Sequence, residues 1–232
     1  MYNPKENYNN KQSVAVYTAK KWLMPSEEAI FELLKFGKNI RILDLGCGWG
    51  RTTAALYEKG FKNIIWVDFA ENLIEGAKAE YPHLAELFFV WDATDLRQFR
   101  AEEFDVVFFS FNGIDYIPDA LSRIQAYHEI FRVLKDGWMY IFSSHNKRCF
   151  PINRLLLKIQ ILNLYRIFSD YWWAGQSFWK MLTYFSTEKR LERDLTMCWF
   201  DKICVIPNTI TLYPYFDAFP YYIYKKSETL WK

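Results

Sequence analysis

The chain has 232 residues, of which 51% are hydrophobic, and this length and composition predict a single domain with one sizeable core. The 29 Lys and Arg nearly balance the 27 Asp and Glu without any dense basic run, which disfavours nucleic acid as a partner. The N-terminus lacks the cationic start and apolar core of a secretory signal, and no uncharged apolar run reaches about 18 residues, so we expect a cytoplasmic protein without a transmembrane segment.

The N-terminal unit, residues 1–37, is expected to be an arm followed by a helix. Residues 1–20 are polar and rich in Asn, Lys and Tyr, which indicates a flexible arm. Between residues 22 and 36, Pro25-Ser-Glu-Glu28 opens an apolar periodic stretch, and proline near the first helical position is typical of a helix start.

The most informative segment is Ile42-Leu-Asp-Leu-Gly-Cys-Gly-Trp-Gly50, which predicts a strand, a tight turn and a helix over about 50–59. Such a turn brings bare backbone against a nucleotide-like ligand at the carboxyl edge of a parallel sheet, and Gly46 and Gly48 permit the close approach. The G-x-G-x-G spacing differs from the dinucleotide fingerprint, and the carboxylate of Asp44 would repel a diphosphate. It would attract an ammonium group instead.

Two further apolar runs also end on acidic residues. The first, over residues 63–68, closes on Asp68, whose carboxylate is placed to accept hydrogen bonds from both hydroxyls of a ribose. Each such bond to a charged group contributes about 1.5–3 kcal/mol. The second run, Leu87-Phe-Phe-Val-Trp91, is followed by Asp92. These acids therefore fall at successive strand ends of one strand–helix series.

The same alternation continues to the C-terminus. We expect a helix at 71–80, strands at 86–91 and 104–110, a helix at 118–134, a strand at 138–144, a helix at about 186–195, and strands at 198–206 and 219–225. Asp95 and Asp119 are interpreted as caps or turn residues rather than ligands.

These residues and their order resemble the S-adenosylmethionine-dependent methyltransferases with a Rossmann-like fold, the class I superfamily, over roughly residues 38–145. The resemblance implies an α/β fold, with a seven-stranded, mostly parallel sheet of order 3-2-1-4-5-7-6 and helices on both faces. It also implies S-adenosyl-L-methionine as cofactor, with the glycine loop beneath its methionine part and Asp92 accepting from the adenine amino group. The predicted cofactor residues are Asp44, Gly46, Cys47, Gly48, Asp68, Phe69, Asp92, Ala93, Ser110 and Tyr17, the last by analogy with relatives whose N-terminal tyrosine folds over the cofactor.

The chain departs from the family at one turn and in one long insertion. Asp136-Gly-Trp138 stands where Pro-Gly-Gly is usual, at a turn remote from the cofactor. Residues 147–185 are expected to form a helical, aromatic-rich cap between the cofactor-binding core (38–146) and the closing helix and strand pair (186–232). Segments in this place commonly cover the active site and select the substrate in the resembled family.

Three interpretations of the insertion stay open. It is strongly apolar over Ile152–Phe168, and many aromatic residues follow, namely Tyr171, Trp172, Trp173, Phe178, Trp179, Tyr184 and Phe185. These residues form the core of the cap or a homodimer interface. Alternatively, they form a pocket for an aromatic, lipid-like or glycosylated acceptor, or a peripheral helix resting on a membrane.

The catalytic candidates follow the fourth and fifth strands. Methyl transfer requires alignment and, for a hydroxyl or ammonium acceptor, removal of a proton. Asn112, Asp115, Tyr116 and His145 are expected at this edge, and an imidazole, with a pKa of about 6.5, suits a general base. A positioning role or a merely exposed one is the alternative for His145.

No metal is predicted. The four cysteines, at 47, 149, 198 and 204, form no Cys-x-x-Cys pair and share no ligand spacing with the three histidines. We interpret them as reduced thiols, and Cys47 as a small residue filling the glycine turn rather than a nucleophile.

The leading function is methyl transfer to an oxygen or nitrogen of a small-molecule acceptor. The alternatives are a nucleic-acid or protein methyltransferase, and a non-catalytic member that binds the cofactor. Ser110-Phe-Asn-Gly113 stands where enzymes that methylate a nucleobase or glutamine nitrogen carry Asn/Asp-Pro-Pro-Tyr, which disfavours that chemistry.

Overall fold

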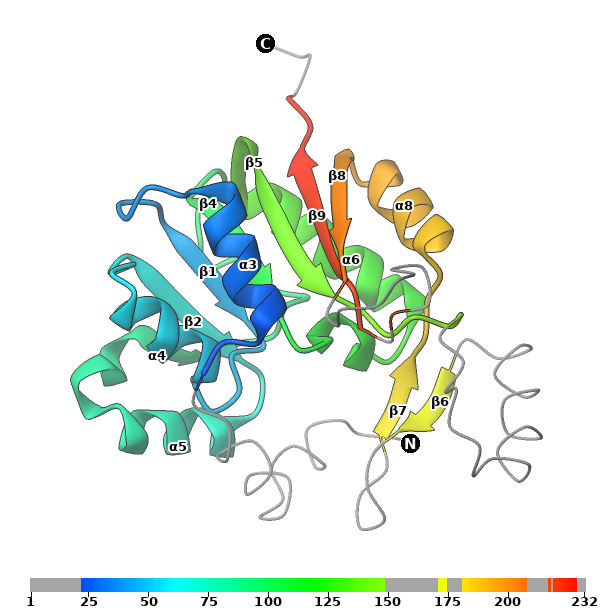
Figure 1. The fold of residues 1–232 in the computed structure, drawn as a ribbon. Coiled ribbons are helices and arrows are strands. Elements are labelled where there is room, and N and C mark those ends of the chain that lie inside the picture. The colour runs from blue at the N-terminus through cyan, green and yellow to red at the C-terminus, as the bar shows by residue number, and fades with distance from the viewer. Residues whose placement is uncertain (1–21, 149–170, 175–180, 208–216, 218, 229–232) are drawn as a thin grey trace.

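A seven-stranded sheet organises the chain in the computed structural model, which describes residues 22–148, 171–174, 181–207, 217 and 219–228 (Figure 1). The helices are α3 (Pro25–Leu34), α4 (Arg51–Glu58), α5 (Glu71–Glu80), α6 (Ala120–Val133) and α8 (Glu188–Met197), with short 3-10 turns η1 (Pro82–Leu87) and η2 (Gly113–Tyr116). The strands are β1 (Ile42–Leu45), β2 (Ile64–Asp68), β3 (Phe88–Val90), β4 (Phe104–Phe109), β5 (Leu134–Ser143), β6 (Tyr171–Ala174), β7 (Met181–Tyr184), β8 (Phe200–Ile206) and β9 (Tyr221–Lys226).

The strand order in this sheet is β3-β2-β1-β4-β5-β9-β8. The first five strands pair in parallel, and β9 runs antiparallel to both β5 and β8. Counted along the chain, the sheet strands stand in the order 3-2-1-4-5-7-6. The predicted Rossmann-like topology is therefore confirmed.

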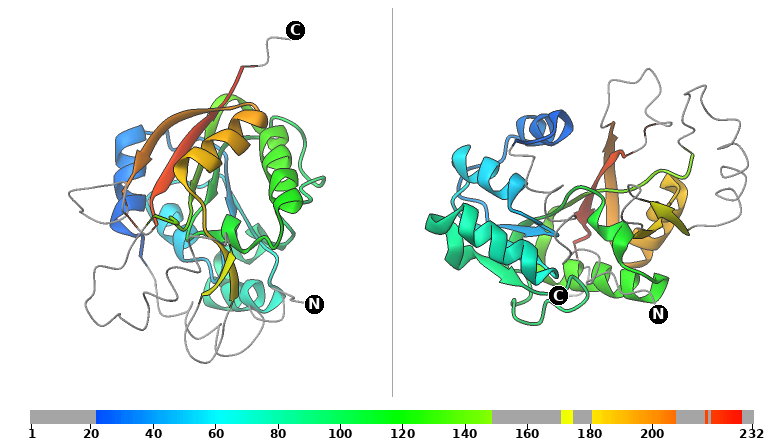
Figure 2. Two further views of the ribbon diagram at one scale, coloured as in Figure 1. Left: turned by 90° about the vertical axis from the view of Figure 1, so that its right-hand side faces the viewer. Right: turned by 90° about the horizontal axis from the view of Figure 1, so that it is seen from below.

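Helices cover both faces of the sheet (Figures 1 and 2). On one face, Phe31 of α3, Leu56 of α4 and Ile74 of α5 pack against β-strand residues of one buried apolar cluster. On the other face, Ile130 of α6 and Leu195 of α8 pack in a second cluster. The central strands are buried on both faces, which explains their nearly continuous apolar runs.

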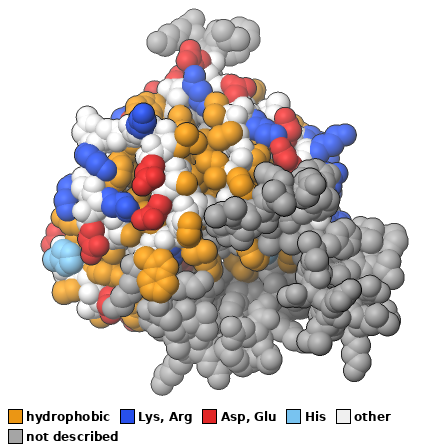
Figure 3. Space-filling model, in the orientation of Figure 1, with side chains coloured by type: hydrophobic (Ala, Val, Ile, Leu, Met, Phe, Trp, Pro, Cys, Tyr) orange, Lys and Arg blue, Asp and Glu red, His pale blue; other side chains and the backbone are white. Residues whose placement is uncertain are grey.

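The described surface mixes charges of both signs. On the face shown in Figure 3, Lys and Arg side chains are interspersed with Asp and Glu side chains. Within the described ranges, no helix has the length and apolar composition needed to cross a lipid bilayer.

The described part of the insertion differs from the helical prediction. Here β6 and β7 pair as an antiparallel hairpin separate from the main sheet. Aromatic and β-branched residues favour extended pairing, which accounts for strands in place of the helix that the preceding apolar run predicts. The described residues do not include Ile152–Phe168, Phe178 or Trp179. The homodimer and membrane interpretations of the insertion depend on these residues and stay predictions.

Helix α3 is anchored to the sheet through a buried carboxylate. Glu27, fully buried, accepts two hydrogen bonds of 2.6 Å from the guanidinium of Arg51 and one of 2.7 Å from the hydroxyl of Tyr221. It also accepts from the backbone N–H of Met24, at 2.7 Å, at the start of its own helix. Residues 22–34 therefore pack as part of the main domain, although the sequence placed them in a separate N-terminal unit.

We expect Glu27→Ala to lower the free energy of unfolding by about 3–5 kcal/mol, because it leaves the Arg51 guanidinium buried without its partner. The matched control is Glu28→Ala. It removes a half-exposed pair with Lys59 (3.1 Å) and should cost no more than about 1 kcal/mol. Urea unfolding followed by circular dichroism measures both. Equal, small losses would show that the buried pair does not anchor the helix.

Candidate functional site

A cavity of about 310 Å³ lies at the carboxyl edge of β1, β2 and β4. Because the chain leaves β1 towards β2 on one side and returns to β4 on the other, this edge is a topological switch point, where ligands of open α/β sheets bind. The structure brings eight of the ten predicted cofactor residues to the cavity wall: Gly46, Cys47, Gly48, Asp68, Phe69, Asp92, Ala93 and Ser110.

The glycine turn forms the floor of this cavity. Gly46 and Gly48 both adopt left-handed backbone, with φ of 63° and 56°. A Cβ on Gly46 would come within 2.7 Å of the Phe109 ring, whereas a Cβ on Gly48 would meet nothing within 4 Å. Gly46 is therefore required by packing as well as by conformation, and Gly48 leaves open space beside its backbone.

Asp44 lies behind the cavity rather than in its wall. It is fully buried on β1, where Thr53 Oγ1 donates to its Oδ2 at 2.8 Å, and its Oδ1 has no hydrogen-bond partner among the described residues. Burial raises the pKa of Asp44 to about 7, against the lowering effects of the Thr53 hydrogen bond and the nearby Arg51 charge. A buried carboxylate with an unpaired oxygen is a site for a hydrogen-bond donor or cation.

Asp68 supports the glycine turn in addition to facing the cavity. Its Oδ2 accepts from the backbone N–H of Gly48 at 2.9 Å, and its Oδ1 accepts from that of Ala70 at 2.8 Å. Burial raises the pKa of Asp68 to about 6, and these backbone bonds lower it. Each carboxylate oxygen can accept a second bond, so Asp68 keeps capacity for a hydroxyl in the cavity.

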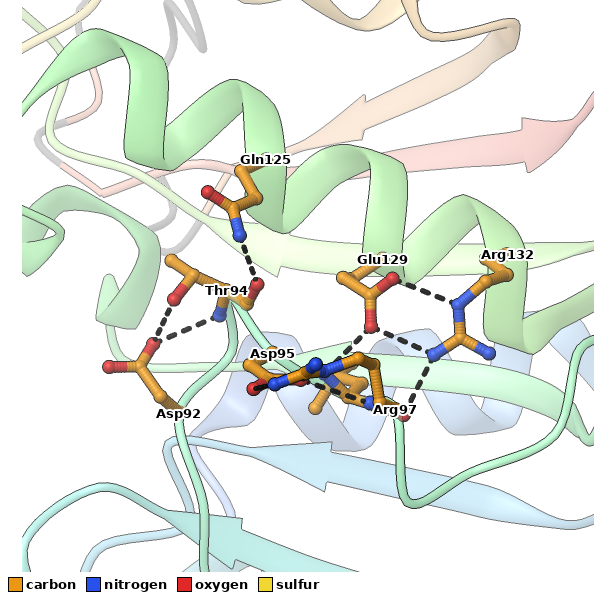
Figure 4. A network of polar contacts seen from close by, with 8 residues as sticks. Asp92, Thr94, Asp95, Arg97, Gln125, Glu129 and Arg132 are labelled. Atoms are coloured by element: carbon orange, nitrogen blue, oxygen red, sulfur yellow. Dashed lines mark hydrogen bonds and ion pairs between the residues drawn. The ribbon is translucent and has the colours of Figure 1, made fainter.

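The loop after β3 holds Asp92 at the cavity rim (Figure 4). Its Oδ1 accepts from both the backbone N–H and the hydroxyl of Thr94, at 2.9 and 2.8 Å. Gln125 of α6 donates to Thr94 O at 2.9 Å, and Arg132 of the same helix donates to Leu96 O at 2.7 Å. The loop is thus tied to α6, while Oδ2 of Asp92 takes no hydrogen bond within the described part of the chain.

The thiol of Cys47 is enclosed in the turn. Burial raises the pKa of this thiol, and the nearby carboxylates of Asp68 and Asp44 raise it further. It is therefore protonated near neutral pH, as expected of a space-filling residue. Among the described residues, no group of three His, Cys, Asp or Glu side chains could hold a metal ion.

The catalytic candidates are divided between the cavity and its surroundings. Tyr116 lines the cavity, whereas Asn112 and His145 do not. Asn112 has left-handed backbone (φ 61°) and donates its N–H to Ser143 Oγ at 2.8 Å, and its buried Oδ1 has no partner in the part of the chain that the structure describes. His145 is buried beside Tyr116, and the distance between their ring centroids is 5.9 Å. Tyr17 lies outside the described residues.

Several residues of the cavity wall were missed in the sequence analysis. They are neighbours of the motif residues or lie beyond β4: Trp49, Arg51, Thr52, Trp91, Phe111 and Ile117. Thr52 Oγ1 lies 3.3 Å from Ser110 Oγ, which joins the start of α4 to the end of β4. Adjacency to the glycine turn could have indicated Trp49, Arg51 and Thr52. No sequence signal links Arg51 to Glu27.

Known methyltransferase sequences are similar to this core. The profile of a family described as a methyltransferase domain matches residues 42–137. A demethylmenaquinone methyltransferase of Leptospira interrogans is 34% identical over 147 residues, covering 61% of this chain and 57% of that relative. A ubiquinone biosynthesis O-methyltransferase of Pseudomonas fluorescens is 28% identical over 116 residues, covering 46% of this chain and 45% of the relative. The chain thus spans about half the length of these curated relatives.

Solved structures share the fold over most of the chain. A SAM-dependent methyltransferase from Methanosarcina mazei superimposes with a TM-score of 0.68 at 22% identity, covering 85% of this chain and 97% of that one. One from Clostridium acetobutylicum superimposes with a TM-score of 0.65 at 17% identity, covering 88% and 91%.

The buried carboxylate of Asp44 predicts a pH-dependent stability. Its pKa is about 7 in the folded protein and 3.8 ordinarily, so the folded state holds the proton more tightly. Ionisation of this group should therefore reduce stability as the pH rises from about 4 to 7, by about 1.4 kcal/mol per pH unit. The difference in the free energy of unfolding between Asp44→Asn and wild type should therefore grow in favour of the variant from about pH 4 to 7 and stay constant above pH 7.

Denaturant unfolding of the ligand-free protein at pH 4, 5.5, 7 and 8 measures this difference. Asp95→Asn is the control, because the hydrogen bond from Arg97 lowers the pKa of the exposed Asp95 to about 2, below the tested range. A difference between Asp44→Asn and wild type that did not change with pH would contradict the prediction.

Proposed function

Because the chain belongs to the class I S-adenosylmethionine-dependent methyltransferases, we propose that it transfers the methyl group of this cofactor to an oxygen or nitrogen of a small molecule. The observation that carries the proposal is the meeting of the glycine turn, Asp68 and Asp92 around one cavity at the switch point of the sheet. The glycine turn follows β1, Asp68 ends β2 and Asp92 follows β3. We assign them to the methionine part, the ribose and the adenine of the cofactor, respectively.

The residues present fit S-adenosylmethionine. The open backbone at Gly48, with the carboxylate of Asp44 behind the glycine turn, suits a cationic amino-acid moiety, and Asp68 has capacity left for ribose hydroxyls. The unused Oδ2 of Asp92 suits the amino group of adenine, with Phe69 and Ala93 as neighbouring wall. When bound, the cofactor supplies a methyl group on a sulfonium, whose C–S bond breaks as an acceptor lone pair bonds to the carbon.

The acceptor class is proposed from the wall residues and the relatives. Aromatic side chains, Trp49, Phe109, Phe111 and Tyr116 among them, line the cavity, which suits a flat or apolar acceptor. Two relatives are named for demethylmenaquinone and ubiquinone biosynthesis, so an aromatic, lipid-like ring is favoured over a glycosylated one. Within this proposal the protein aligns the acceptor and excludes water, and His145 receives the acceptor proton.

Calorimetric titration with S-adenosylmethionine and S-adenosylhomocysteine tests the cofactor site. We expect Asp68→Ala to weaken both by about 100-fold or more, because it removes two hydrogen bonds to a charged acceptor, each of about 1.5–3 kcal/mol. Asp201→Ala, on the exposed surface of β8, is the matched control and should bind as the wild type does. Thermal unfolding of each variant separates lost binding from lost folding. Absence of binding to wild type would refute the proposal.

Substitution of His145 tests the proposed base. We expect His145→Ala to keep cofactor affinity within about threefold, because the side chain does not line the cofactor cavity, and to lower turnover of a hydroxyl acceptor by about 10²–10⁴-fold. Steady-state formation of S-adenosylhomocysteine with a phenolic acceptor measures the effect. Unchanged turnover would remove His145 from the mechanism.

A further inference from the structure

A buried pair of side chains stands beside the cofactor cavity, at the ends of η2 and β5. Asp115 is 1% exposed, and its Oδ2 lies 2.7 Å from Nδ1 of His145 and accepts from the His145 backbone N–H at 2.6 Å. Its Oδ1 accepts from the hydroxyl of Ser144 at 2.8 Å. Both oxygens are therefore held by the segment that carries the histidine.

This arrangement selects one form of the imidazole. Asp115 accepts from the backbone N–H of His145 and from the hydroxyl of Ser144, and the same carboxylate faces Nδ1. Because an ionised carboxylate can only accept hydrogen bonds, Nδ1 carries the proton in the neutral ring. The lone pair is then on Nε2, at the far end of the ring. Nε2 takes no hydrogen bond from any residue in the described ranges.

Aromatic side chains from three parts of the chain surround the ring. Phe185 follows β7, and its ring centroid is 4.9 Å from that of His145; Phe219 precedes β9 and is 5.1 Å away; Tyr116 is 5.9 Å away. Tyr116 also lines the cofactor cavity, so one aromatic side chain neighbours both that cavity and the histidine.

The end of the insertion is fixed to this position by backbone pairing. Ser186 donates its N–H to His145 O at 3.0 Å, and Lys147 donates its N–H to Ser186 O at 2.7 Å. Phe185 is therefore held against the imidazole by the same short pairing that extends β5. The insertion thus supplies a wall to the histidine, and this wall is apolar.

Resting on the proposed function, we propose that Asp115 is a positioning residue that holds His145 in the Nδ1–H form, and that the acceptor is a hydroxyl on an aromatic ring. Nε2 takes the hydroxyl proton while an oxygen lone pair bonds to the methyl carbon and the C–S electron pair leaves with sulfur. The imidazolium so formed is stabilised by Asp115 and then releases its proton to solvent.

The surroundings favour a hydroxyl over an amine. An amine acceptor, once neutral, already presents a nucleophilic lone pair, whereas a ring hydroxyl is a poor nucleophile until its proton is removed. The three aromatic walls match a planar ring.

Nitrogen-15 NMR of the histidine rings tests the positioning role without any turnover. We expect the neutral His145 ring of wild type to carry its proton on Nδ1, and Asp115→Asn to shift the neutral ring towards the Nε2–H form. Asp201→Asn, remote on β8, is the control and should leave the spectrum unchanged. An Nε2–H ring in wild type would overturn the proposal even if the variant failed to fold.

Turnover across a series of substituted phenols tests the acceptor class. We expect Asp115→Asn to lower kcat about 100-fold for phenols that are protonated at the assay pH, and less than about threefold for phenols that are already ionised. An equal loss for all phenols would assign Asp115 a structural role only and overturn the proposal.

If wild type binds the cofactor but methylates amines and no phenol, the hydroxyl assignment falls while methyl transfer stands. If the cofactor does not bind, the proposed function itself fails, and the ring tautomer still decides the role of Asp115.

Discussion

The buried pair between Arg51 and Glu27 joins three distant parts of the sequence at one point. Arg51 is the first residue of α4 directly after the glycine turn, Glu27 belongs to α3, and Tyr221 of β9 donates to the same carboxylate. Because Asp68 holds the turn at Gly48, the turn is fixed at both ends by charged groups. The cavity floor therefore depends on buried electrostatics in addition to the left-handed backbone of its glycines.

Burial of carboxylates is the cost of this arrangement. Asp44 and Asp68 both lie in the interior next to the cavity, and burial raises the pKa of each to about 7 and 6. A ligand that brings hydrogen-bond donors and a positive charge would reduce the free-energy cost of burying these carboxylates. The ligand-free protein is therefore less stable at the position where a bound ligand would stabilise it. The exposed Asp92, by contrast, sits on a loop that α6 keeps in place.

The sequence determined the fold and predicted the residues that meet at the cavity. Continuous apolar runs, which are typical of buried strands, predicted the parallel strands. These runs end at Asp44, at Asp68 and just before Asp92, and the observed strand order confirms the strands. Glycines at 46 and 48 predicted the turn, since glycine favours the positive φ that both adopt, and at Gly46 the packing against Phe109 also excludes a Cβ. These features are local, because neighbouring residues in the chain encode each of them.

Tertiary structure alone decided the contacts between distant segments. Nothing in the sequence around Glu27 indicates its pairing with Arg51, and nothing around Asp115 indicates that its Oδ2 faces both the backbone N–H and the Nδ1 of His145. The hairpin of β6 and β7 likewise formed where a helix was expected. The physical reason is that a strand end or a helix start can be read from period and turn residues, whereas the partner of a buried charge is set by which elements the sheet order brings together.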